Sequence, residues 1–204
     1  MHTIVLTEDE KDCLQEIMNV AYGNATAAIT EIFNAFAKLS IPHIQIIDSS
    51  SLKNYLSDEL NFDDEHFVAL QQINGDISGE NMFIIDKKSA INMAYKFDLD
   101  DENLTNEDIC DITLEVTNIL SSSTISKLSE NMQTSVSFSA PTIKVINSIN
   151  QLNNIFINKY QKIIIISTKL EFEDLNINGE LFILTTDKSI LFIKEKLNKI
   201  LEEL

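Results

Sequence analysis

The sequence is short of several residue types, and each shortage argues against a class of protein. It has 15 basic residues against 32 acidic ones, and the net charge of −17 argues against binding to nucleic acid or to anionic lipid headgroups. It has only two cysteines, Cys13 and Cys110, which lack a metal-ligand spacing and lie beside aspartates on predicted helices. We therefore expect reduced thiols in a cytoplasmic protein.

Long apolar segments and familiar catalytic constellations are also missing. No apolar run exceeds four residues; one of these runs, residues 163–166, predicts a buried strand, and neither a membrane-spanning segment nor a signal peptide is visible. The three histidines (His2, His43 and His66) are scattered, and no Gly-rich phosphate loop or nucleophile beside a base occurs. We expect no metal or cofactor bound by the chain itself, and no covalent catalysis.

Proline is the scarcest of the turn-forming residues, and its two occurrences mark an internal repeat. Three polar positions recur at a spacing of 99 residues, and a proline follows each asparagine after 22 further residues. The first copy is Asp12, Glu16, Asn19 and Pro42, and the second is Asp111, Glu115, Asn118 and Pro141. Four matched positions at one offset indicate a duplicated functional unit.

Each copy of the motif lies on a predicted long helix. Thr7 and Glu10 have capping-box spacing, and the helix that they begin is expected to run to about Leu39. The second helix is expected to run from residues 104–108 to about Met132. Projection at about 100° per residue places the motif of the first helix opposite an apolar stripe, which comprises Leu14, Met18, Ala21, Ala25, Ile29, Ile32 and Phe36. In the second helix Thr113, Thr117 and Thr124 interrupt that stripe, which predicts either a rotated packing angle or weaker burial.

The remaining elements follow the same order in each half. Strands are predicted at 43–48, 66–73 and 81–85, and again near 134–139, 142–146, 162–172 and 181–185, and each half ends in a helix (86–97 and 190–204). Residues 49–65 predict a loop or short helix, and the acidic run 98–102 a solvated linker. The fold class is therefore α+β: a duplicated α-β-β-β-α unit with pseudo-two-fold symmetry, with mixed or antiparallel sheets flanked by two long motif helices. We expect one domain, 1–204, made of two intertwined repeats at about 1–98 and 99–204.

A single Glu-x-x-Asn on an exposed helix is most often only a solvated face, but its duplication favours a function. On a helix, Glu16 and Asn19 are neighbours, so a carboxylate that can pair with a cation lies beside an amide that can hold water. The same holds for Glu115 and Asn118. Such a pair can complete an active centre that belongs to a partner protein. The prolines are interpreted as helix stops. Asp12 and Asp111 can equally well be contacts to the partner or solvated acids of the first helical turn, which the helix dipole favours.

The pattern Asp/Ser-x3-Glu-x2-Asn-x22-Pro resembles the signature of the CheC/CheX/FliY phosphatases of bacterial chemotaxis, and both copies carry it in full. The resemblance covers essentially the whole chain. It implies dephosphorylation of the response regulator CheY, whose phosphoaspartate lies beside a bound Mg²⁺. Asn19 and Asn118 would position the attacking water, and Glu16 and Glu115 would pair with a lysine of CheY. The second copy departs from the family by lacking the glycine that follows the first.

Two complete motifs in about 200 residues are most similar to the CheC type. CheX-type members typically keep one active motif and dimerise, whereas the internal duplication here makes a monomer sufficient. A FliY-type protein would carry a further flagellar-switch domain. The alternative to an enzyme is an adaptor that binds the deamidase CheD, or that is associated with the flagellar switch, with weak or vestigial phosphatase activity.

Overall fold

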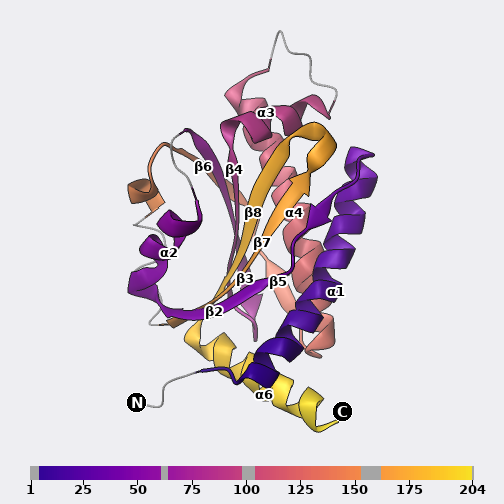
Figure 1. The fold of residues 1–204 in the computed structure, drawn as a ribbon, viewed down its shortest axis with the longest axis vertical. Coiled ribbons are helices and arrows are strands. Elements are labelled where there is room, and N and C mark those ends of the chain that lie inside the picture. Colours follow the sequence, from indigo (N-terminus) through magenta and orange to yellow (C-terminus); the bar gives the residue numbers. More distant parts are fainter. Residues whose placement is uncertain (1–4, 61–63, 98–103, 153–161, 204) are drawn as a thin grey trace.

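The computed structural model describes residues 5–60, 64–97, 104–152 and 162–203. Two long helices dominate it, α1 (Glu8–Phe33) and α4 (Asn106–Asn131), and they pack against each other. Figure 1 shows them side by side and running in opposite directions on one side of the molecule. The predicted linker 98–102 lies outside the described residues.

The sheet brings together strands from both halves of the chain. Its order is β1-β7-β8-β4-β3-β5, with β2 also paired to β7 and β6 also paired to β3, and all the described pairs are antiparallel. The strands of the first half are β1 (Lys38–Leu39), β2 (His43–Asp48), β3 (His66–Gly75) and β4 (Gly79–Asp86). Those of the second are β5 (Val136–Phe138), β6 (Thr142–Ile146), β7 (Lys162–Phe172) and β8 (Ile177–Thr185).

Each half lends its first two strands to the other half. Strands β1 and β2 pair with β7, whereas β5 and β6 pair with β3. The central strands β4 and β8 pair symmetrically: Gly79 faces Thr185, and Ile85 faces Gly179. The sheet therefore has a pseudo-two-fold axis between β4 and β8, and the α+β fold class predicted from the sequence is confirmed.

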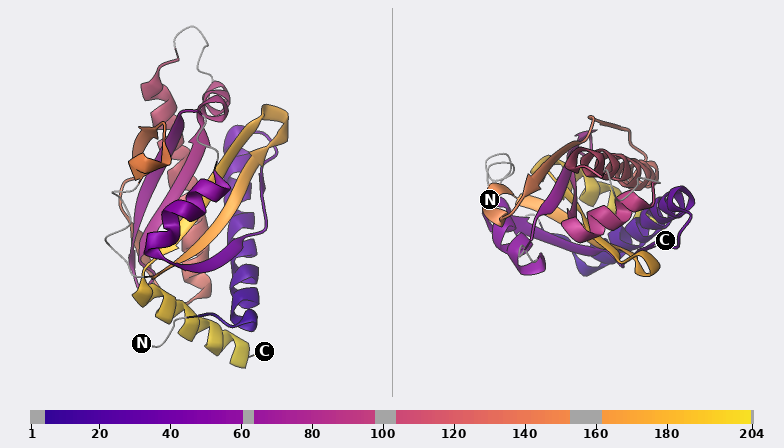
Figure 2. Two further views of the ribbon diagram at one scale, coloured as in Figure 1. Left: turned by 60° about the vertical axis from the view of Figure 1, so that its left-hand side comes forward. Right: turned by 90° about the horizontal axis from the view of Figure 1, so that it is seen from above.

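The core lies on both faces of this sheet. The larger apolar cluster fills the space between the sheet and helices α1, α3 (Lys87–Tyr95), α4 and α6 (Asp187–Glu202). A smaller cluster lies under α2 (Leu52–Glu59) on the opposite face. The views in Figure 2 show α2 and the long helices on opposite sides of the strands. Short 3-10 turns at Ser49–Ser51, Ile149–Leu152 and Glu173–Leu175 complete the described elements.

The end of the first motif helix differs from the prediction. Helix α1 ends at Phe33 rather than near Leu39, because Asn34 takes a left-handed conformation (φ 44°) that closes the helix. Phe36 (78% exposed) lies beyond the helix, and Ile32 (45% exposed), although still helical, is turned towards solvent, so neither belongs to the buried stripe. Phe33 takes that place, four residues after buried Ile29, as the helical period requires.

The second motif helix is not less buried than the first, so that alternative is wrong. Thr113, Thr117 and Thr124 are all fully buried. Two of these threonines hydrogen-bond to the backbone of their own helix: Thr113 Oγ1 donates to the Ile109 carbonyl at 2.7 Å, and Thr117 Oγ1 donates to the Thr113 carbonyl at 2.6 Å. A threonine that bonds back to its own helix can be buried without an external partner.

Candidate functional site

The first copy of the motif lies in the N-terminal half of α1. The capping box begins the helix: the Glu10 backbone N–H donates to Thr7 Oγ1, and the Thr7 N–H donates to the Glu10 carboxylate. Asp12, Glu16 and Asn19 are all exposed on the face that turns away from the core. One turn further lies Gly23, where an added Cβ would meet no atom within 4 Å, so no side chain stands beside the asparagine at this point of the helix surface.

The second copy is presented in the same way by α4. A capping box of Thr105 and Asp108 begins this helix, and Asp111, Glu115 and Asn118 are exposed. Within the described ranges, no ion pair engages the carboxylates of either copy. Both Glu/Asn pairs are therefore accessible to a partner protein.

The two motif prolines are not helix stops, contrary to the sequence interpretation. Helices α1 and α4 have already ended at Phe33 and Asn131, and each proline directly precedes an outer strand, β2 or β6. Pro42 is buried, and its carbonyl accepts a hydrogen bond of 2.9 Å from Gln15 Nε2 on α1. The proline segment is thus fastened to the motif helix.

The two sites differ in how their asparagines are held. Asn118 Oδ1 accepts a hydrogen bond of 2.9 Å from Nε2 of Gln71, a buried residue of β3. No corresponding hydrogen bond is made by Asn19 within the described part of the chain. Sequence reasoning missed Gln71, because its contact with α4 depends on the strand pairing and follows no sequence spacing.

The side chains that border the sites differ as well. Ile41, next to Pro42, is an exposed large apolar residue, and so is Val20 beside Asn19. At the matching offset the second site has Ala140 and a half-buried Ile119. The first site therefore offers more apolar contact surface to a partner than the second.

The cysteines beside the motifs are not activated nucleophiles. Burial raises the pKa of the Cys13 thiol. Burial also raises the pKa of Cys110, and the nearby carboxylates of Asp111, Glu107 and Glu65 raise it further. Both shifts favour the protonated thiol, which is a poor nucleophile and a poor metal ligand. Both cysteines are free, as expected.

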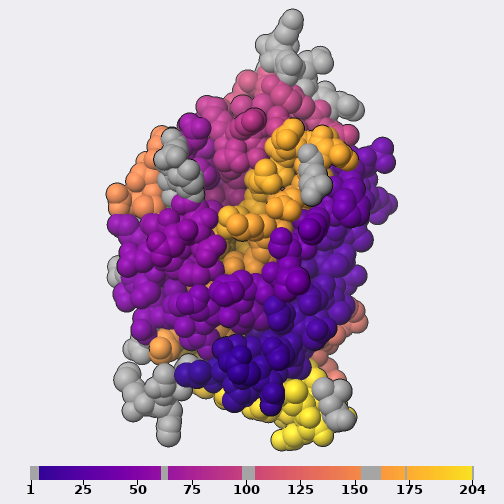
Figure 3. All heavy atoms as spheres, viewed as in Figure 1, coloured from indigo at the N-terminus to yellow at the C-terminus, as the bar shows by residue number. Residues whose placement is uncertain are grey.

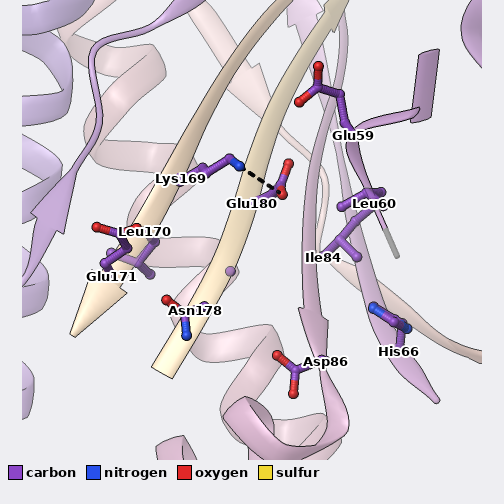
Figure 4. A pocket seen from close by; sticks show the side chains of 11 residues that line it. Glu59, Leu60, His66, Ile84, Asp86, Lys169, Leu170, Glu171, Asn178 and Glu180 are labelled. Atoms are coloured by element: carbon purple, nitrogen blue, oxygen red, sulfur yellow. Dashed lines mark ion pairs between the residues drawn. The ribbon is translucent and has the colours of Figure 1, made fainter. Parts of the chain in front are cut away.

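A cavity of about 420 Å³ lies on the opposite side of the sheet, and no motif residue lines it. Figure 3 shows the corresponding hollow, where β7 and β8 reach the surface between α2 and α1. Burial is the main cause that raises the pKa of the Glu180 carboxyl in this cavity, and Lys169 Nζ lies 4.0 Å away from it (Figure 4). The candidate site is therefore the exposed helix surface rather than this cavity.

Metal-binding clusters and membrane-spanning helices are both absent from the residues that the structure describes. Among them, no group of three or more His, Cys, Asp or Glu side chains is arranged to hold a metal ion. None of the described helices combines the length and the apolar character needed to cross a membrane.

The chain is similar to known chemotaxis and flagellar proteins. Residues 67–149 match the family model for the chemotaxis phosphatase CheX. The fold resembles FliY from Thermotoga maritima, with 22% identity, a TM-score of 0.73, and coverage of 96% of this chain and 98% of that one. It also resembles the CheX chain of a CheX–CheY–BeF3–Mg complex from Borrelia burgdorferi (14% identity, TM-score 0.53, 84% and 97% covered). FliM in a FliM–SpeE complex from H. pylori has the fold as well (14% identity, TM-score 0.65, 96% and 97% covered). The CheX model and the FliY and CheX folds confirm the resemblance to the CheC/CheX/FliY type that the motifs indicated.

Proposed function

For a protein of the CheC/CheX/FliY type with two exposed Glu/Asn pairs, we propose the activity of a protein phosphatase that hydrolyses the aspartyl-phosphate of the response regulator CheY. The observation that carries the proposal is the placement of both pairs on the outer faces of rigid helices, with neither carboxylate paired to a described residue. The similarity to the CheX family and to the CheX chain of a complex with CheY supports CheY as the partner.

The proposed mechanism inserts one Glu/Asn pair into the partner's active centre. Glu16 or Glu115 pairs with a lysine of CheY and fixes the register of docking. Asn19 or Asn118, one helical turn away, hydrogen-bonds the water that attacks the phosphorus in line with the aspartyl oxygen. The Mg²⁺ that neutralises the phosphoryl charge belongs to CheY, so this chain contributes positioning.

The charge of the chain shapes how docking must occur. A net charge of −17 gives long-range repulsion towards an acidic partner, which salt screens beyond about 10 Å at 0.1 M. Binding then rests on local pairing at Glu16 or Glu115 and on apolar contacts such as Ile41. We propose that this occurs in the cytoplasm, with the chain acting as a monomer.

The decisive experiment measures phosphate release from phosphorylated CheY with Mg²⁺ present. We expect Asn19→Ala combined with Asn118→Ala to reduce the acceleration by at least about a hundredfold, since a positioned water is lost at both sites. Because both side chains are exposed, the variant should keep the wild-type unfolding temperature. A double variant as fast as the wild type would remove the proposal.

An adaptor function is the second candidate, because FliM also has this fold. In that case the chain would bind CheD or a component of the flagellar switch and would hydrolyse phosphate only weakly. Phosphate release with and without added CheD separates the two functions. Strong acceleration by the chain alone favours the enzyme, whereas tight binding of CheD with no acceleration favours the adaptor.

A further inference from the structure

The pseudo-symmetry of the sheet matches each residue of β3 with one of β7. Ile73 of β3 pairs with Gly79 on one side and Phe138 on the other, and Leu170 of β7 pairs in the same way with Gly179 and Leu39. Two residues earlier on each strand, the equivalent positions are Gln71 and Thr168. Both side chains point to the sheet face that α1 and α4 cover.

Gln71 and Thr168 share one contact and differ in another. Thr168 Oγ1 donates to the Ser40 carbonyl at 2.6 Å. Gln71 Nε2 donates at 3.0 Å to the carbonyl of Ser139, which is the counterpart of Ser40 in the repeat, 99 residues after it. Each bond fastens the segment before a motif proline to a long strand. Only the longer side chain of Gln71 also reaches a motif asparagine, donating to Asn118 Oδ1 at 2.9 Å.

Burial makes the Gln71 contact a rigid one. Gln71 is only 1% exposed and lies in a strand paired on both sides, so its amide has little freedom to turn away. The bond fixes the orientation of the Asn118 side chain before any partner arrives. Nδ2 of Asn118 and the second lone pair of Oδ1 remain available to a water molecule.

We propose that Gln71 is a positioning residue for the second site and that the two sites of this protein differ in preorganisation. Site two holds its asparagine in advance, whereas site one, with Thr168 in the matching position, orders Asn19 only when the partner binds. This inference rests on the proposed phosphatase function. It predicts that the Gln71 contact acts on kcat rather than on KM, because the contact orients the asparagine without touching the docking surface.

The test isolates site two in an Asn19→Ala background and adds Gln71→Thr. Threonine is the residue that the other half uses here, so the tie to the Ser139 carbonyl can be kept while Asn118 is released. We expect kcat for phosphate release to fall about three- to tenfold with KM unchanged, because the Asn118 side chain would then lose conformational entropy when it is ordered in each reaction. The matched control is Thr168→Ser in an Asn118→Ala background, which keeps a hydroxyl for the Ser40 carbonyl and should leave site-one kcat unchanged.

An activity-free measurement tests the geometry itself. NMR relaxation of the side-chain amide should show Asn118 more rigid than Asn19 in the free protein, and Gln71→Thr should remove that difference. Equal mobility of the two amides, or an unchanged site-two kcat in Gln71→Thr, would overturn the inference. The inference would also be overturned if Asn118→Ala kept its activity while Asn19→Ala had none, because the asparagine held by Gln71 would then not contribute to catalysis. Full activity after loss of both asparagines would instead contradict the proposed function.

Discussion

Substitutions at Gly23 should affect the stability of the fold and the docking of the partner differently. Gly23 lies in the middle of α1, one turn beyond Asn19, and is exposed. A glycine in a helix interior costs about 1 kcal/mol relative to alanine, and an added Cβ here would meet no atom within 4 Å. Gly23→Ala should therefore stabilise the protein by about 1 kcal/mol, which for this size raises Tm by roughly 2–4 °C.

A large residue at the same position should have the opposite effect on function. Gly23→Arg also favours helix, so the free energy of unfolding should stay at or above that of the wild type. The long side chain would stand beside Asn19 on the proposed docking face. In an Asn118→Ala background we expect at least a tenfold fall in kcat/KM for phosphate release, a loss of about 1.4 kcal/mol of transition-state binding.

The matched control is Ser122, which occupies the equivalent position on α4. Ser122→Arg should lower kcat/KM only when site two is measured alone, in an Asn19→Ala background. Thermal unfolding and phosphate release are measured on the same preparations. A stable Gly23→Arg protein with undiminished site-one activity would refute docking on this face of α1. A destabilised Gly23→Ala protein would refute the local geometry.

Two further predictions concern stability. Although burial raises the pKa of Glu10, hydrogen bonds from Lys194 and the Thr7 N–H leave it lowered overall. The lowered folded-state pKa means that this stabilisation is present above the unfolded value, near 4.5, and is lost as pH falls through the folded pKa. Glu10→Gln should cost about 1–2 kcal/mol at pH 7 and progressively less below pH 4.5 in denaturant titrations; a constant difference would contradict this. Gly79→Ala should cost about 3 kcal/mol or more, because the added Cβ would collide with the carbonyl oxygen of Leu184 on the neighbouring strand. Unfolding of this variant at the wild-type denaturant midpoint would show that the two strands can move apart there.

Local sequence patterns were sufficient to locate most elements. The β-branched run of β7 predicted its bounds correctly, as Lys162–Phe172, and the capping threonines located the starts of both motif helices. These signals work because a helix cap or a buried strand depends on residues only a few positions apart. The roles of the glycines were less visible. Gly79 and Gly179 belong to β4 and β8, where atoms of the neighbouring strand leave no room for a side chain, and this close packing has no local sequence signal.

The exposure of the two asparagines also followed from the sequence, since helical periodicity places Asn19 opposite the apolar positions. The catalytic roles of the motif residues remain predictions that the phosphate-release experiment tests. The end of α1 was predicted too late because the left-handed cap at Asn34 has no strong sequence signal. Asparagine takes that conformation more readily than most residues, but Asn24 of the same segment is helical, so the residue type alone does not place the cap.

The sequence by itself determined the repeat, the two helices and the outward direction of the motif, because each follows from covalent spacing and helical geometry. The tertiary structure decided which half supplies the outer strands beside each long strand, and therefore which side chain lies behind each asparagine. Gln71 reaches Asn118 across 47 residues of chain, through a strand whose register is set by hydrogen bonds to β4, β5 and β6. Such pairings are selected by the packing of the whole sheet, so no local pattern could reveal that two nearly identical motifs are held differently.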